Sequence, residues 1–270
     1  MAIPPNPAFR ATLFSLVVLL WFGSLSGFCQ STLSRSSSFG ILIGNSNFHA
    51  LDLLLSPLNY RANNFSAELF YRHRKSPVLQ EVSLVGSGGD INTVVPHFTL
   101  TGVRAGLSYS YLRQVSAIGS KESEHTFSVG GILRAFMNVE GSEEHDVVSW
   151  LMVYSVNLAV QGDFVFNSNH QLSWQIYLPL IAMVHRPPYA RLNESLLESN
   201  NRFFMAISSY GNIAAITDYP MIGNVLTYRY TMFNRFHFLV KHSFEYHKYS
   251  SPDTIKMFFV NISVGVNWNL

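Results

Sequence analysis

The chain has 270 residues and a formal net charge of +2, with 48% hydrophobic, 14% aromatic and only 13% charged residues. Soluble domains average about a quarter charged residues, so this composition argues against an ordinary soluble domain, and no basic patch indicates a nucleic-acid partner. If its single cysteine, Cys29, leaves with a signal peptide, the mature chain forms no disulfide.

Residues 1–29 have the features of a secretory signal peptide. Arg10 precedes an apolar run at residues 11–23, and small residues follow before Cys29. This run is shorter than the roughly 20 residues that a membrane-spanning helix needs, so a cleaved signal is favoured over an anchor. We expect cleavage after Cys29. Lipidation of Cys29 is the alternative, and the bulky neighbour Phe28 argues against it.

Residues 30–270 form a single predicted domain in which apolar and polar residues alternate with a period of two, as in β-strands with one apolar face. The predicted strands span residues 38–45, 48–56, 64–74, 103–113, 126–139, 149–162, 170–183, 222–232, 235–248 and 257–270, of which the first two are the weakest.

Strand length indicates a membrane protein. Most of these strands have 11 to 14 residues, whereas strands of soluble sandwiches average about 5–6 and a tilted membrane strand needs about 9–11. Aromatic residues lie near strand ends on the apolar face, as an interfacial girdle requires. These are Trp150, Trp174, Tyr109, Tyr228, Tyr230 and Trp268. The sequence therefore predicts an all-β, antiparallel transmembrane β-barrel, with a soluble secreted β-sandwich as the alternative.

Ten strands with both chain ends in the periplasm put the two longest connections, 75–102 and 184–221, on one side, as expected for extracellular loops. Further strands near 79–85 and 203–209 would make twelve, and loss of the two weak early strands would leave eight. The other predicted connections are 46–47, 140–148 and 249–256 on the same side, and 57–63, 114–125, 163–169 and 233–234 on the opposite side.

The C-terminal segment KMFFVNISVGVNWNL resembles the insertion signal of Gram-negative outer-membrane proteins, with Trp268 and Leu270 at the last apolar positions. Leu270 departs mildly from the usual Phe or Trp. This resemblance implies recognition by the barrel-assembly machinery and a location among outer-membrane lipids. The signal ending in Cys29 and Gln30 resembles those of exported Bacteroidota proteins, and the architecture of residues 30–270 resembles barrels of that group.

Outer-membrane phospholipase A and lipid A deacylase resemble the chain in size and export. These families carry His-x-Ser, because a spacing of two puts base and nucleophile on the same face of a strand. None of the ten histidines here is followed by Ser at the second position. The sequence therefore favours a protein without enzymatic activity, assigns no catalytic residue and keeps a lipid-modifying hydrolase as the alternative function.

The polar strand faces predict a lumen lined by charged residues. The candidates are Arg72, Arg104, Arg134, Arg229, Lys241, Glu68, Glu245, His237 and His247. A hydrated basic lumen would favour anions, whereas about eight to ten strands leave little free space and favour a packed, ion-paired interior. The polar face that carries His237 and His247 belongs to one strand and shows no converging ligands, so no metal or cofactor is predicted.

These features predict a structural or interaction protein, or a narrow porin-like solute channel. The loops 75–102 and 184–221 are the expected surfaces for an extracellular or membrane partner.

Overall fold

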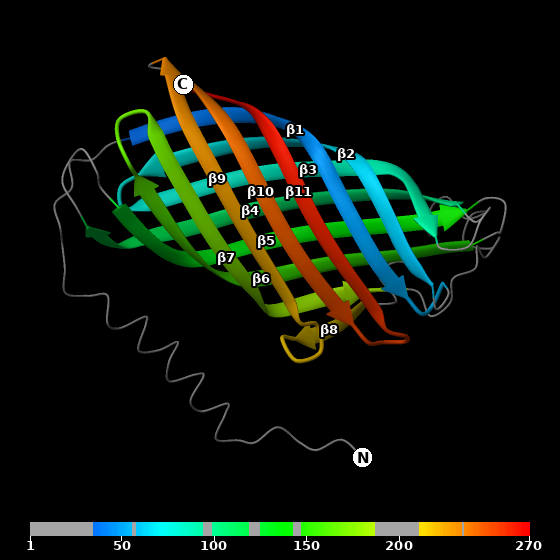
Figure 1. Ribbon diagram of the computed structural model, residues 1–270. Coiled ribbons are helices and arrows are strands. Elements are labelled where there is room, and N and C mark those ends of the chain that lie inside the picture. The colour runs from blue at the N-terminus through cyan, green and yellow to red at the C-terminus, as the bar shows by residue number, and fades with distance from the viewer. Residues whose placement is uncertain are drawn as a thin grey trace, which may run out of the picture. The chain divides into compact units, whose positions relative to one another are not determined.

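The alternating segments form antiparallel β-strands that belong to one sheet. The computed structural model describes residues 35–55, 58–93, 99–118, 125–142, 147–186, 211–233 and 235–270. Its strands are β1 (Arg35–Asp52), β2 (Asn59–Lys75), β3 (Val78–Thr93), β4 (Thr99–Ile118), β5 (His125–Ser142), β6 (Val147–Val165), β7 (His170–His185), β8 (Gly211–Ala215), β9 (Met221–Phe233), β10 (Phe236–Tyr249) and β11 (Ile255–Asn269) (Figure 1). The predicted signal peptide, residues 1–29, lies outside the described residues.

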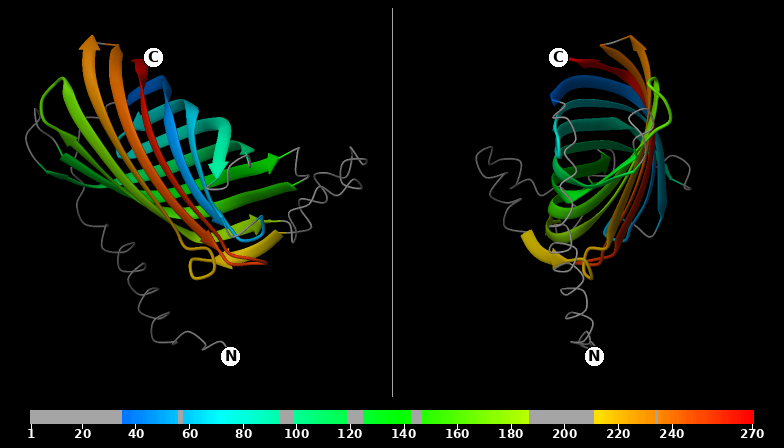
Figure 2. Two further views of the ribbon diagram at one scale, coloured as in Figure 1. Left: turned by 45° about the vertical axis from the view of Figure 1, so that its right-hand side comes forward. Right: turned by 90° about the vertical axis from the view of Figure 1, so that its left-hand side faces the viewer.

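Ten of these strands close into a barrel. Each strand from β1 to β7 pairs with the next, and β9, β10 and β11 continue the ring from β7. The ring closes because β11 pairs with β1, from Ser38 opposite Asn269 to Asp52 opposite Ile255. Figure 2 shows the red last strand beside the blue first strand. The predicted all-β barrel of ten strands is therefore confirmed.

The strand that follows β7 around the barrel is in two pieces. β8 pairs with Ile181–His185, and β9 pairs with His170–Tyr177. Both pieces run antiparallel to β7, so together they cover one edge of it, and residues 216–220 leave the sheet between them. The excursion contains Tyr219, whose side chain is only 1% exposed.

The first strand differs from the prediction. Residues 38–45 and 48–56 are predicted as separate strands, but a single strand, β1, runs through both. The predicted connection, Ser46 and Asn47, is paired within the sheet. The apolar pattern is interrupted because Asn45 and Asn47 are exposed on the outer face, where the preceding part of the strand is apolar.

The prediction that 75–102 is a long loop is wrong, because this segment contains β3. The strand that the sequence offered only as an alternative, near 79–85, extends over 16 residues and pairs with both β2 and β4. Alternation is weak there because outward positions include Gly86 and Gly88. The additional strand β3 compensates for the merging of the first two predicted strands into β1, so the number of barrel strands stays at ten. The alternatives of eight and twelve strands are therefore wrong. The other candidate strand, 203–209, lies outside the described residues.

The two ends of the barrel differ in their connections. We call the end where β1 begins and β11 ends the terminal end, and the opposite end the loop end. The chain leaves β7 at the loop end and re-enters the sheet there as β8, since His185 pairs with Gly211. The link from β1 to β2 is also at the loop end, so the predicted placement of 57–63 on the opposite side is wrong. The placement is wrong because β1 is one strand where two were predicted, so the chain reverses direction one time fewer before it reaches this link.

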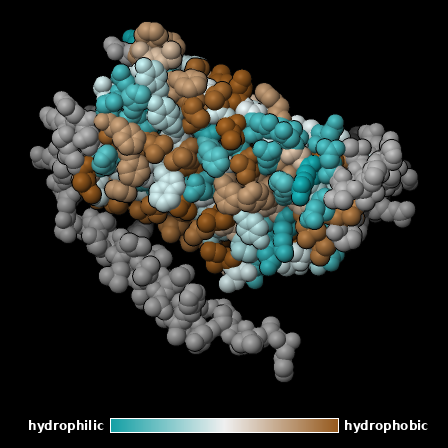
Figure 3. Space-filling model, in the orientation of Figure 1, coloured by the Kyte–Doolittle hydropathy of each residue, from teal (hydrophilic) through white to brown (hydrophobic). Residues whose placement is uncertain are grey.

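The outer face is apolar around the middle of the barrel and polar toward the loop end. In β2, Phe65, Leu69 and Tyr71 are exposed, whereas the exposed residues nearer the loop end are Asn59, Arg61 and Asn63. Figure 3 shows brown residues across the middle of this face and teal residues gathered on its right-hand part. The barrel strands have 13 to 20 residues, more than the roughly 9–11 needed to cross a bilayer, so the polar ends extend beyond it.

Among the described residues, no helix has the length and apolar character required to cross a membrane.

The closing seam provides a test of the strand packing. A Cβ atom added to Gly265 would collide with the main-chain oxygen of Ile41, whereas a Cβ atom on Gly86 would have its nearest neighbour at 4.0 Å. We expect Gly265→Ala to lower the free energy of unfolding by about 1–3 kcal/mol, and Gly86→Ala to change it by less than about 0.5 kcal/mol. Urea unfolding in lipid vesicles, followed by gel mobility, measures both. Equal stability of the two variants would contradict the close approach of β1 and β11.

Candidate functional site

Apolar side chains fill the interior of the barrel near the loop end. They belong to one contiguous cluster, each is at most 5% exposed, and Phe259 stacks on Phe48 with ring centroids 5.0 Å apart. This loop-end plug consists of Phe48, Tyr60, Ile91, Leu100, Phe136, Leu151, Val153, Tyr219, Met257 and Phe259. Because packed protein interiors contain few voids larger than a water molecule, the plug obstructs this half of the lumen.

A buried ion pair lies beside the plug at the loop end. Arg186, directly after β7, pairs with Asp52 at the end of β1, and each side chain is 1% exposed. Ser149 Oγ donates to Asp52 Oδ2 at 2.8 Å, and Arg186 also donates to the main-chain oxygen of Asp253. Burial lowers the pKa of Arg186, and the Asp52 carboxylate opposes this shift. The pair ties the ends of β1 and β7 to the link between β10 and β11.

At the centre of the lumen, Glu245 of β10 receives two arginines. Arg134 of β5 donates from Nη2 to both carboxylate oxygens, at 2.8 and 2.7 Å, and Arg104 Nη2 of β4 lies 3.7 Å from Oε2. Tyr177 of β7 donates its hydroxyl to Oε1 at 2.8 Å. All three ionised side chains are less than 10% exposed. Removing charges from water is costly, and converging hydrogen bonds of this kind offset that cost.

The two central arginines also contact aromatic rings of the plug. The guanidinium carbon of Arg104 lies 4.0 Å from the ring centroid of Phe259, and that of Arg134 lies 5.4 Å from the centroid of Phe136. Cations over aromatic faces are attracted by the ring quadrupole, most strongly where water is excluded. The arginines therefore join the apolar plug to the polar half of the lumen.

His247 extends the central cluster to the segment between β8 and β9. Its Nε2 lies 3.2 Å from Glu245 Oε2, and its Nδ1 is hydrogen-bonded to the hydroxyl of Tyr219. Because an ionised carboxylate only accepts, Nε2–H donates to Glu245, and Nδ1 of the neutral ring accepts from Tyr219. Burial raises the pKa of Tyr219, so its hydroxyl keeps its proton. Tyr219 and His247 are each 1% exposed, so this chain of hydrogen bonds is closed to solvent.

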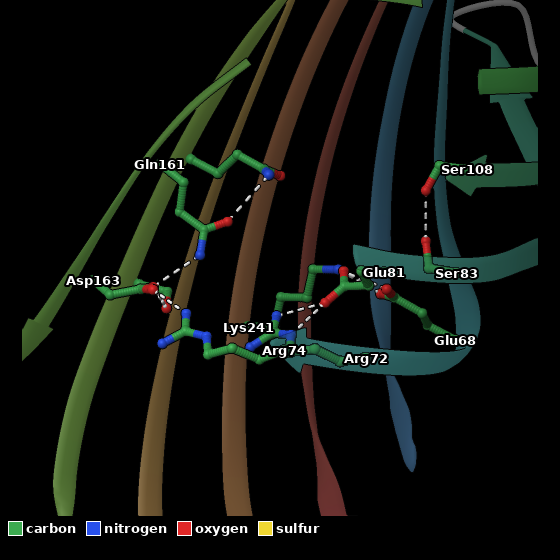
Figure 4. Close-up of polar contacts among 11 residues, drawn as sticks. Glu68, Arg72, Arg74, Glu81, Ser83, Ser108, Gln161, Asp163 and Lys241 are labelled. Atoms are coloured by element: carbon green, nitrogen blue, oxygen red, sulfur yellow. Dashed lines mark hydrogen bonds and ion pairs between the residues drawn. The ribbon is translucent and has the colours of Figure 1, made fainter. Parts of the chain in front are cut away.

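The lumen toward the terminal end is polar and contains three further ion pairs (Figure 4). They are Arg72 with Glu81 at 2.6 Å, Arg74 with Asp163 at 2.5 Å and Lys241 with Glu68 at 2.7 Å. Each pair joins side chains from different strands, and Asp163 also accepts from Gln161 Nε2 at 2.8 Å and from Ser173. The basic members are 17% to 34% exposed, so solvent reaches this half of the lumen.

The structure places all nine lumen candidates on the inner side of the wall. Arg104, Arg134, Glu245 and His247 meet in the central cluster. Glu68, Arg72, Arg229 and Lys241 line a cavity nearer the terminal end. His237 Nδ1 lies 3.0 Å from Thr231 Oγ1. Arg235 lies two residues before His237, so the period of two would place it on the same inner face, but it is exposed in the turn before β10.

Several partners of these residues are absent from the sequence prediction. The sequence does indicate that Arg74 points inward, because it lies two residues after Arg72 and so on the same strand face. Glu81 was not predicted as an inward residue because its strand, β3, was predicted as part of a loop. Asp163 lies one residue beyond the predicted strand 149–162. Tyr219 had no signal at all, because nothing in the sequence indicates that residues 216–220 bring it into the barrel.

The predicted interfacial aromatics lie on the outer face. Trp174, Tyr109 and Tyr230 are 37% to 43% exposed, and Trp150, Tyr228 and Trp268 are partly exposed. The ring of Trp268, near the end of β11, packs on Phe39 of β1 with centroids 4.8 Å apart. This part of the predicted insertion signal therefore lies at the closing seam.

No three His, Cys, Asp or Glu side chains of the described residues are grouped closely enough to hold a metal ion. The structure does bring one serine and one histidine together across neighbouring strands. Ser37 Oγ lies 2.8 Å from His73 Nδ1, at the terminal end of β1 and β2. Within the described part of the chain, no carboxylate or amide side chain is hydrogen-bonded to the other ring nitrogen of His73. A base without such a partner is not oriented as nucleophilic catalysis requires.

Comparison with solved structures shows that the fold is that of outer-membrane β-barrels. The outer-membrane protease OmpT from Escherichia coli aligns over 92% of this chain and 100% of its own, with a TM-score of 0.51 and 7% identity. The transport unit of the autotransporter AIDA-I from Escherichia coli aligns over 99% of both chains, with a TM-score of 0.45 and 9% identity. No protein-family model and no curated protein sequence matches the chain.

The central cluster predicts unequal effects of two Glu→Gln variants. Glu245→Gln leaves Arg104 and Arg134 buried without their carboxylate, and breaking such a buried pair costs about 3–5 kcal/mol of unfolding free energy. Glu81→Gln is the matched control, because the Arg72–Glu81 pair is about a fifth exposed and its loss costs about 1–2 kcal/mol. Urea unfolding in lipid vesicles measures both values. A cost for Glu245→Gln no larger than that for Glu81→Gln would contradict a central role for Glu245.

Proposed function

We propose that the chain is an integral outer-membrane β-barrel whose lumen is closed, and that it has a structural or interaction role. Its fold is that of an outer-membrane β-barrel, its outer face is apolar around the middle, and its strands are long enough to cross a bilayer. Outer-membrane lipids would contact this face. The C-terminal strand would be read by the barrel-assembly machinery, after a signal peptide is cleaved following Cys29.

The packing of side chains inside the barrel is the observation that supports a closed lumen. The loop-end plug draws side chains from seven strands, β1 to β6 and β11, and Tyr219 joins them from the segment between β8 and β9. Beyond the plug, the central cluster ties β10 to β4, β5 and β7 through Glu245. The described part of the lumen contains two neighbouring cavities of about 50 and 80 Å³, both lined by Glu68, Glu81 and Lys241. Each is large enough for a few water molecules. A narrow solute channel is the alternative, and it requires these side chains to move aside.

The loop end is the side that we propose faces the cell exterior. The chain leaves β7 and enters β8 at this end, and the polar outer surfaces of β1 and β2 are there too. Long extracellular loops and short periplasmic turns are typical of outer-membrane barrels. Of the two predicted partner surfaces, 75–102 is lost because it contains β3, and 184–221 is shortened because Gly211–Ala215 form β8. The part between β7 and β8 is the remaining long connection.

A conductance measurement tests the closed lumen. We expect purified, folded protein in planar bilayers to show no stable conductance steps, because the plug leaves no continuous water path. Replacing Phe48, Phe136 and Phe259 by Ala together removes three plug rings and is expected to produce steps. The matched control replaces the outward Phe65, Phe236 and Phe258 by Ala and stays silent. Steps from the unaltered protein would support the channel alternative and contradict the closed lumen.

The contact between Ser37 and His73 makes lipid hydrolysis a testable alternative. We expect the folded protein to release no fatty acid from phospholipid or lipid A vesicles above the level of Ser37→Ala, because His73 lacks an orienting partner. The control is Ser243→Ala, which also removes a strand hydroxyl but lies in the lumen. Fatty-acid release that Ser37→Ala abolishes and Ser243→Ala preserves would establish a hydrolase and overturn this expectation.

A further inference from the structure

Arg229 is the interior cation whose charge the described residues leave uncompensated. In the terminal half of the lumen, Arg72, Arg74 and Lys241 each have a carboxylate within 2.7 Å. No carboxylate of the described residues lies within 4.0 Å of Arg229, and Leu239 and Gln171 are its partners in the sheet.

The charges around Arg229 leave the region positive. Asp163 and Glu81 attract its guanidinium, but Arg74 and Arg72, which are bonded to these two carboxylates, repel it. Four basic side chains, Arg72, Arg74, Arg229 and Lys241, therefore face three carboxylates, Glu68, Glu81 and Asp163. A cleft with an excess of one sign of charge and apolar walls concentrates the opposite ion.

The uncompensated guanidinium lines a cavity of about 50 Å³. One water molecule needs about 10–15 Å³ of such space, so the cavity has room for a small polyatomic ion. Neutral hydrogen-bond donors from several strands line it together with Arg229. They are Ser110, Gln175 and Thr227. Hydroxyl and amide donors beside a guanidinium suit the several acceptor oxygens of an oxyanion.

The same cavity is also lined by a buried hydrogen-bond acceptor, Asn267 Oδ1, that has no donor among the described residues. Asn267 is only 1% exposed. Buried polar atoms in proteins nearly always have such a partner. A hydrogen phosphate ion carries a hydroxyl that can donate to Asn267 and further oxygens that can accept from Arg229, whereas chloride offers no donor.

We propose that this cavity binds a small protonated oxyanion of the phosphate class, with Arg229 as its principal charged contact. The site lies on the terminal side of the central cluster and is reached from the terminal end, so it does not require an open lumen. It therefore goes beyond the proposed closed barrel, and a failure of one does not imply a failure of the other.

The test is isothermal titration of the folded protein in lipid-free detergent with inorganic phosphate at constant ionic strength. Saturable binding is expected for the unaltered chain, with affinity at least about 10-fold lower for Arg229→Gln. The matched control is Arg113→Gln, which removes the same charge near the terminal end of β4 from an exposed position that does not line the cavity. Its affinity is expected to match that of the unaltered chain. Gel mobility before and after heating shows that each variant is folded.

The outcomes separate the sources of phosphate. Saturation by inorganic phosphate, with weaker binding of glycerol 3-phosphate, supports a site for the free ion. Stronger binding of glycerol 3-phosphate supports a site for the phosphate of a lipid headgroup. Absence of binding by either probe would overturn the proposal, and so would an equal loss of affinity in Arg229→Gln and Arg113→Gln.

Discussion

The pairing of β11 with β1 is the interaction on which the rest of the structure depends. Fifteen residue pairs close the sheet on itself, so the edges of the first and last strands find partners within the chain. In a bilayer an unpaired strand edge would leave backbone amides and carbonyls without hydrogen bonds, at a cost of several kcal/mol each. Closure fixes an inside and an outside, and every second side chain must then enter a small enclosed space.

That enclosed space explains the pattern of charge. Ten strands surround an interior only wide enough for side chains, so the inward arginines cannot remain fully hydrated. The chain compensates most of these cations locally. Glu245 pairs with Arg134 and Arg104, and nearer the terminal end Glu81, Asp163 and Glu68 pair with Arg72, Arg74 and Lys241, whereas Arg229 has no such partner among the described residues. The ion pairs also connect strands that are not neighbours in the sheet, such as β5 and β10. The polar interior therefore adds bracing across the lumen that backbone hydrogen bonds along the wall cannot supply.

The two halves of the lumen have different physical roles. Toward the loop end, apolar packing and the Asp52–Arg186 pair exclude water. Toward the terminal end, the side chains of the ion pairs are partly exposed and enclose a small polar cavity. The central cluster around Glu245 is the boundary between them, since its arginines contact both the carboxylate and the aromatic rings of the plug. Such a barrel can hold a small ligand in its terminal half without forming a through channel.

The sequence by itself determined the barrel, because an apolar residue at every second position over 11 to 14 residues, as in 149–162, is sufficient to identify a strand with an apolar outer face. It also identified inward residues such as Arg134 and Glu245, because the period of two assigns each side chain to one face. It failed at β1 and β3, where outward Asn47 and Gly86 break the apolar pattern. Only the tertiary structure decided which arginine meets which carboxylate, because those contacts cross the lumen between distant strands. The sequence specifies the face of each side chain, and barrel closure and register specify its partner.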